Sequence, residues 1–147
     1  MADRDTGRRP WHLWAVGTAA LLLAGSGAYD QIMTLTLDEH YFRQQGYGSA
    51  QRDYFSDYPA IPAVLWIVAV WSTLAAAVLL LLRRRRARDA AVVGLISQTC
   101  LALTTFAVMD RWSVFGASFA LVDIVILALT AGFTAYCWSM SARGVLH

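Results

Sequence analysis

The chain has 147 residues, of which 58% are hydrophobic and 15% charged, and its formal net charge is +2. Soluble domains carry about a quarter charged residues. The low charge, and the gathering of the apolar residues in long blocks, exclude an ordinary soluble domain. They indicate one transmembrane domain over residues 1–147 with an all-α fold.

Four apolar blocks follow one another along the chain. An α-helix crosses roughly 30 Å of hydrocarbon with about 20 residues, and each block is close to that length or longer. We therefore predict a four-transmembrane-helix bundle. Its spans cover residues 11–29, 60–82, 90–109 and 112–140, and a connection over residues 30–59 joins the first two.

Arginine placement predicts the orientation, since all twelve basic residues are arginine. Nine lie on one side, at positions 4, 8, 9 and 143 and in a run of Arg83, Arg84, Arg85, Arg86 and Arg88. By the positive-inside rule this side is cytoplasmic. We expect a multi-pass protein of the bacterial inner membrane with both termini in the cytoplasm. The arginine run is a stop-transfer signal that also attracts anionic lipid.

The first block has a second interpretation. Basic residues, an apolar run and the small residues at 24–28 also fit a signal peptide. Cleavage before Tyr29 would leave three spans and an outer N-terminus.

The connection over residues 30–59 contains the pattern of two short helices. Residues 36–39 fit a capping box that opens a helix through about Gln44, and Ser49 is placed to cap a second one. The segment is rich in rings: Tyr41, Phe42, Tyr54, Phe55 and Tyr58. The rings fit either a lid lying on the bundle or an aromatic surface for a sugar or another planar solute.

Asp123 is the polar residue that most needs an explanation. It lies about eleven residues into the fourth block, roughly 16 Å deep and near the midplane, where an acidic group costs about 2.5–3.5 kcal/mol. Residues at a similar depth could form a polar belt around it: Gln98, Thr99, Ser72 and Thr73. The alternatives are a belt that only joins the helices, a solute site or proton relay, and pairing with another protein.

Motifs of soluble enzymes do not occur in the sequence. It has no phosphate-binding loop, zinc-protease motif, nucleophile elbow or CxxC. Cys100 and Cys137 both lie in apolar blocks and fit small buried hydrophobic residues. We expect no enzyme activity, no metal, no cofactor and no nucleic-acid partner.

Several segments resemble a family of small four-span membrane proteins of alphaproteobacteria, often of sphingomonads. The segments are residues 10–14, 27–30, 33–34, 54–55, 69–71, 79–85 and 142–146. The family is uncharacterised and often loosely labelled "sugar transporter". The resemblance implies four helices and an uncleaved first span. Residues 58–62 depart from the family's proline–tryptophan pair at the second span.

Two functions remain open at this stage. One is a small-solute, sugar-like transporter that works as a homodimer. The alternative is an accessory or assembly subunit that docks a larger membrane complex. Small residues repeating every four positions at Ala69–Thr73–Ala77 and Ala128–Gly132 suit helix packing within the chain or between chains.

Overall fold

The computed structural model describes residues 10–147 and is helical throughout, with no strand in that range. Two short helices, α2 (Glu39–Gln44) and α3 (Ser49–Ser56), lie between the first two long ones. The four long helices are α1 (Trp11–Leu35), α4 (Ala60–Leu81), α5 (Arg86–Ala107) and α6 (Arg111–Ala142).

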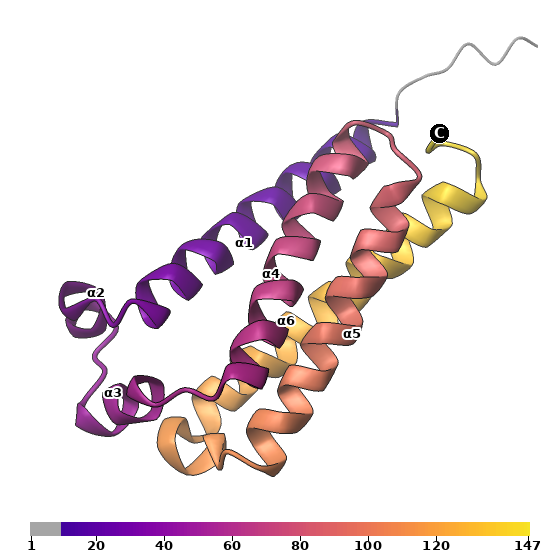
Figure 1. The fold of residues 1–147 in the computed structure, drawn as a ribbon. Helices are drawn as coiled ribbons and strands as arrows, with labels where there is room; N and C mark the ends of the chain where they lie inside the picture. The colour runs from indigo at the N-terminus through magenta and orange to yellow at the C-terminus, as the bar shows by residue number, and fades with distance from the viewer. Residues whose placement is uncertain (1–9) are drawn as a thin grey trace, which may run out of the picture.

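The long helices run beside one another, so the connections gather at two ends (Figure 1). The start of α1, the α4–α5 connection and the C-terminus lie at one end, which we call the arginine end because it contains residues 83–88. The short helices and the α5–α6 connection lie at the other end. We call it the aromatic end, after the cluster around Tyr41, Phe42 and Phe55.

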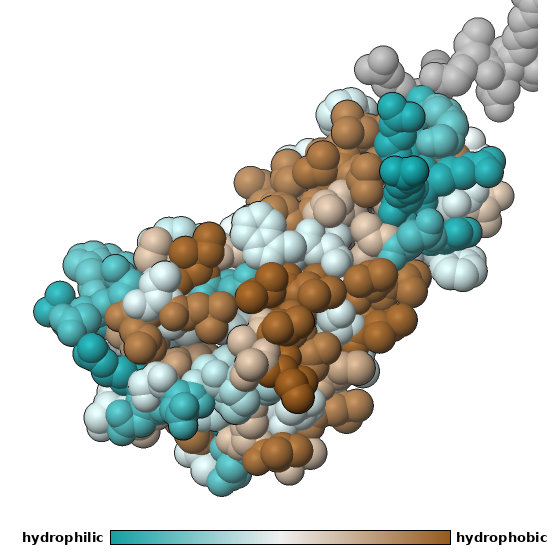
Figure 2. Space-filling view, in the orientation of Figure 1, coloured by the Kyte–Doolittle hydropathy of each residue, from teal (hydrophilic) through white to brown (hydrophobic). Residues whose placement is uncertain are grey.

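The prediction of an all-helical fold is confirmed for residues 10–147. α4, α5 and α6 are long and apolar enough to cross a membrane. A fourth span at α1 stays a prediction. Figure 2 shows apolar residues in a broad area of the side of the molecule, between hydrophilic residues at the two ends.

Helices α4 and α5 approach each other most closely. A Cβ atom placed on Gly94 would lie 2.6 Å from the Thr73 hydroxyl and 3.3 Å from the Ala69 carbonyl oxygen. Ala69, Ala76 and Ala77 are buried on the same side of α4. The small-residue repeat of the second span therefore packs within the chain, where small side chains let two backbones come together.

Two element boundaries differ from the sequence-based ones. α1 continues past Tyr29 to Leu35, because no glycine or proline interrupts it there and the chain turns only at Leu37, with φ 53°. α5 begins at Arg86, within the arginine run, since arginine is a good helix former. The turn before it uses Arg83 at φ 58°.

The arginine end has one core shared by all four long helices. Leu13 of α1, Leu80 of α4, Ala87 of α5 and Cys137 of α6 are at most 2% exposed. The C-terminal segment closes this core with Leu146, which is 0% exposed.

Main-chain hydrogen bonds hold the C-terminal segment in place. The His147 amide donates to the Arg83 carbonyl at 2.8 Å, and the Arg85 amide donates to the His147 carbonyl at 3.2 Å. Gly144 makes the preceding turn possible with φ 70°, a conformation that glycine adopts without strain. The last residues are thus an ordered part of the bundle end.

Candidate functional site

The rings of the aromatic end form a core of their own. Tyr41, Phe42 and Phe55 are 6–7% exposed, and Tyr54 and Tyr58 are half-buried against them. Most of the ring pairs meet edge to face, which is a favourable arrangement of aromatic quadrupoles. The rings face one another, so the geometry fits the predicted lid and not an open aromatic surface for a planar solute.

Phe115 joins this lid to α6. Its ring centroid lies 5.8 Å from that of Tyr47, 5.3 Å from that of Tyr54 and 5.7 Å from that of Phe55. Sequence reasoning treated Phe115 as an ordinary residue of the fourth span. Phe115 lies four residues after Arg111 and directly before Gly116, and this position was the one feature of the sequence that could have indicated its contact with the lid.

Polar contacts fix the short helices. Asp38 caps α2 by accepting from the Tyr41 amide at 2.7 Å, so the cap lies two residues after the predicted Thr36. The Tyr41 hydroxyl donates to Asp30 on α1. Gln51 of α3 accepts from the Gly48 amide at 2.9 Å and donates to the Val114 carbonyl at 2.8 Å. The lid is therefore tied to α1 on one side and to the start of α6 on the other.

Burial changes the ionisation of the lid tyrosines. It raises the pKa of Tyr47 and Tyr54, and the positive charge of Arg111 opposes the shift in both. Burial also raises the pKa of Tyr58. These hydroxyl groups keep their protons at neutral pH. The Tyr54 hydroxyl is buried without a hydrogen bond to any residue that the structure describes.

A break in α6 determines the geometry of the charged pair. Gly116 has φ 78° and ψ −177°, a conformation essentially restricted to glycine. In an unbroken helix Arg111 and Asp123 would be about 18 Å apart along the axis, at 1.5 Å per residue. The break turns residues 111–115 out of line with the rest of α6. Arg111 can then reach back to the carboxylate twelve residues later.

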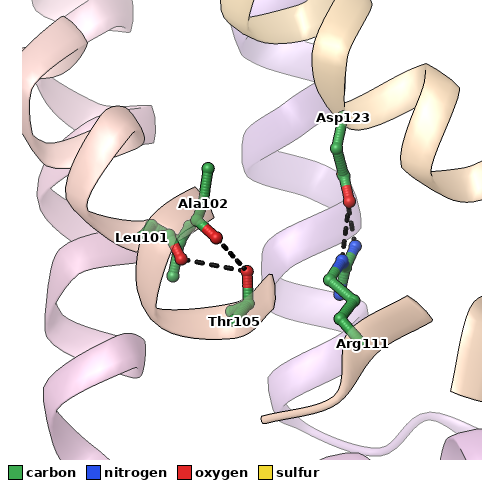
Figure 3. A network of polar contacts seen from close by, with 5 residues as sticks. All are labelled: Leu101, Ala102, Thr105, Arg111 and Asp123. Carbon is green, nitrogen blue, oxygen red and sulfur yellow. Dashed lines mark hydrogen bonds and ion pairs between the residues drawn. The ribbon is translucent and has the colours of Figure 1, made fainter. Parts of the chain in front are cut away.

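Arg111 and Asp123 form a two-bond ion pair (Figure 3). The Arg111 Nε donates to Asp123 Oδ2 at 2.6 Å, and its Nη2 donates to Oδ1 at 3.3 Å. The guanidinium carbon lies 4.7 Å from the centroid of the Phe115 ring. A paired carboxylate costs far less in an apolar environment than an isolated one, so Arg111 supplies part of the compensation that Asp123 requires.

The pair remains partly accessible. The side chains of Arg111 and Asp123 are 18% and 21% exposed. Asp123 lines a hollow of about 360 Å³ between the last turns of α5 and the first half of α6. The other residues lining this hollow, which we call the α5–α6 groove, are apolar: Ala102, Leu103, Phe106, Ala107, Ile124 and Leu127.

Asp123 lies closer to one helix end than its position in the sequence suggested. It follows the Gly116 break by seven residues, about 10 Å along the helix, whereas roughly 28 Å separate it from Ala142. The estimate from the sequence counted residues 112–116 as part of the span. The break removes them, and Asp123 lies toward the aromatic end.

The structure does not assemble the predicted polar belt. The Thr73 and Thr99 hydroxyls donate to the carbonyls of Ala69 and Leu95, each four residues earlier in its own helix. Ser72 and Gln98 are half-buried, and within residues 10–147 neither bonds to Asp123. In a helix, the threonine hydroxyl often donates its hydrogen bond to a main-chain carbonyl of the preceding turn. Thr105, near the pair in Figure 3, does the same with the carbonyls of Leu101 and Ala102.

A polar contact between α1 and α4 was also missed. The Trp71 Nε1 donates to Gln31 Oε1 at 3.1 Å, and Gln31 is 2% exposed. Sequence reasoning placed Gln31 in the loop, because it ended the first helix at residue 29. The continuation of α1 to Leu35 is what brings Gln31 beside α4.

Comparison of the chain with protein-family models, curated proteins and solved structures found no match. The function must therefore be argued from the groove, the ion pair and the three helices that are long and apolar enough to cross a membrane.

Proposed function

We propose that the chain is a four-span protein of the bacterial inner membrane that serves as an assembly subunit, holding a transmembrane helix of a larger partner in the α5–α6 groove. Two parts of this proposal have separate support. The first is α1 as a fourth span. The second is the groove as a helix-binding surface.

The length and packing of α1 support its role as a span. Its 25 residues extend about 37 Å, more than the roughly 30 Å of hydrocarbon. Leu13 in its first turn and Thr34 in its last turn are both 2% exposed. A signal peptide cleaved before Tyr29 would remove Leu13 from the shared core and cut the helix in its interior, so an uncleaved α1 is the better reading.

The arginine end supports cytoplasmic termini. α1 begins and the chain ends beside residues 83–88, so the start of α1 and the C-terminus both lie at the arginine end of the bundle. Reporter fusions at residue 147 and within residues 45–50 test the orientation. We expect the first to report cytoplasm and the second the outer side. The intact mass of the purified protein tests cleavage, and a mass lacking residues 1–28 would contradict a fourth span.

Asp123 is the observation that carries the assembly function. A carboxylate, even a paired one, is poorly placed against lipid acyl chains. Yet only 6% of the most apolar stretch of α6 is buried inside the chain, against 28% for α5. A protein helix laid in the groove would cover the pair and supply hydrogen-bond partners that lipid lacks.

The groove continues along α6 as a track suited to a helix. Ile124 lines the groove, and Ala128 and Gly132 follow on the same face at intervals of four residues. Ala128 is exposed, and nothing lies within 4 Å of a Cβ atom placed on Gly132. Small residues at such spacing let a second helix backbone approach closely. Hence the occupant we propose is a transmembrane helix of a different chain.

The test compares two glycine substitutions. Gly132→Leu fills the track without touching the interior of the chain. Gly25→Leu is the matched control. Nothing lies within 4 Å of a Cβ atom placed on Gly25 either, but Gly25 lies on α1 and not on the track. We expect native mass spectrometry from the protein's own membrane to show a complex with one reproducible second chain. Gly25→Leu should keep this complex and Gly132→Leu should lose it.

Two outcomes would overturn the assembly function. A complex that survives Gly132→Leu does not use the track. A homodimer carrying a small solute would favour the sugar-like transporter instead, since Asp123 lines a hollow of solute size. In that case Asp123→Asn should abolish uptake while the protein still folds.

A further inference from the structure

The arginine end contains a second hollow, of about 280 Å³, between the first turn of α1 and the last turn of α4. Pro10, Leu13 and Trp14 form one wall, and Leu81, Leu82 and Arg83 form the other. Leu82 is 63% exposed and Trp14 48%, so the walls are open at the side. The hollow thus combines an apolar surface with a basic residue, Arg83, at the end of α4.

The position of Arg83 is determined by the fold. Its backbone adopts φ 58°, and its Nε donates to the Val145 carbonyl at 3.2 Å. The C-terminal segment therefore orients the guanidinium, whose Nη groups carry further donors in a fixed plane. A pre-oriented guanidinium loses less entropy when it binds a phosphate than a mobile side chain does.

The surrounding charge is positive. Arg84, Arg85 and Arg86 are exposed beside the hollow, whereas Arg88 pairs with Asp89 at 2.9 Å. Arg85 is also held, through Nε, by the Leu146 carbonyl at 3.3 Å. At the membrane surface such a cluster attracts anionic lipid.

We propose that this hollow binds one anionic phospholipid, with the phosphate on Arg83 and the start of an acyl chain along Trp14, Leu81 and Leu82. The charge complementarity selects an anionic headgroup, and the apolar walls select a lipid over a soluble phosphate ester. The site is distinct from the α5–α6 groove and lies at the opposite end of the bundle. It requires only that the end of α4 lies at the membrane surface.

The experiment titrates the purified full-length protein with phosphatidylglycerol, phosphatidylcholine and inorganic phosphate, and counts bound species by native mass spectrometry. We expect one phosphatidylglycerol per chain, bound at least about fivefold more tightly than phosphatidylcholine. Inorganic phosphate at matched concentration should not displace it.

Two arginine variants locate the site. Arg83→Gln should weaken phosphatidylglycerol binding about fivefold, the effect of one surface arginine. Arg86→Gln removes the same charge from the adjoining start of α5, and Arg86 does not line the hollow. We expect it to change the affinity by less than about twofold.

A third variant covers the case in which Arg83→Gln disturbs the C-terminal segment. Leu82→Glu puts a negative charge on an exposed wall residue and should also weaken phosphatidylglycerol binding. Equal effects of Arg83→Gln and Arg86→Gln, equal affinity for the two lipids, displacement by inorganic phosphate, or full binding by Leu82→Glu would each overturn the proposal.

Discussion

The two ends of the bundle are held together by different means. At the arginine end, small residues let the long helices share a core, and Ala76, Ala77 and Ala87 are all 0% exposed. At the aromatic end, large rings fill the space beneath two short helices, and one ion pair joins the two parts of α6. Close backbone packing tolerates little change, because a side chain added between two helices meets main-chain atoms. The α5–α6 groove and its carboxylate lie toward the aromatic end, where the chain is held by side-chain contacts.

The largest expected effect comes from the close approach of α4 and α5. Gly94→Leu forces side-chain atoms against the Ala69 carbonyl and the Thr73 backbone, neither of which can move aside. We expect a loss of about 3 kcal/mol of stability or a failure to assemble. Gly27→Leu is the control, because nothing lies within 4 Å of its Cβ position. Thermal unfolding in detergent measures both variants, and equal midpoints would contradict the close contact.

The ion pair should have the next largest effect. Asp123→Asn or Arg111→Gln leaves one partly buried charge or donor without its partner. Breaking a buried pair costs about 3–5 kcal/mol, and partial exposure lowers our expectation to about 2 kcal/mol. Arg52→Gln, which breaks the exposed pair with Glu39, should cost less than about 0.5 kcal/mol.

A double-mutant cycle separates pairing from packing. If the two charges interact, Arg111→Gln combined with Asp123→Asn should cost less than the sum of the single changes. Additive losses measured by the same unfolding assay would mean that each side chain acts through other neighbours.

Composition was sufficient to predict three long apolar helices but not the geometry of the ion pair. Long apolar blocks are recognisable whatever their partners, and three of them became α4, α5 and α6. The Arg111–Asp123 pair depends on Gly116 leaving the helical region, and a glycine in an apolar run equally fits close helix packing. The docking of Leu146 is a contact between distant segments that no local pattern encodes. Asp123 itself was found because an acidic residue in a span requires compensation.

A smaller effect than that of the Arg111–Asp123 pair should come from the bond between the lid and α1. Tyr41→Phe removes the hydroxyl that donates to Asp30 and should cost about 1 kcal/mol. Tyr29→Phe is the control, since Tyr29 is 55% exposed and makes no side-chain hydrogen bond within the described residues.

The pH dependence of stability tests whether the Tyr41 hydroxyl causes the loss in Tyr41→Phe. Burial, together with Asp30, raises the pKa of Tyr41 above the ordinary value of 10.0. A raised pKa means that the folded state holds the proton more tightly than the unfolded state. The bond therefore contributes fully below pH 10 and its contribution falls as the pH rises beyond that value. The stability difference between the native chain and Tyr41→Phe should narrow above pH 10, and a constant difference would assign the loss to packing instead.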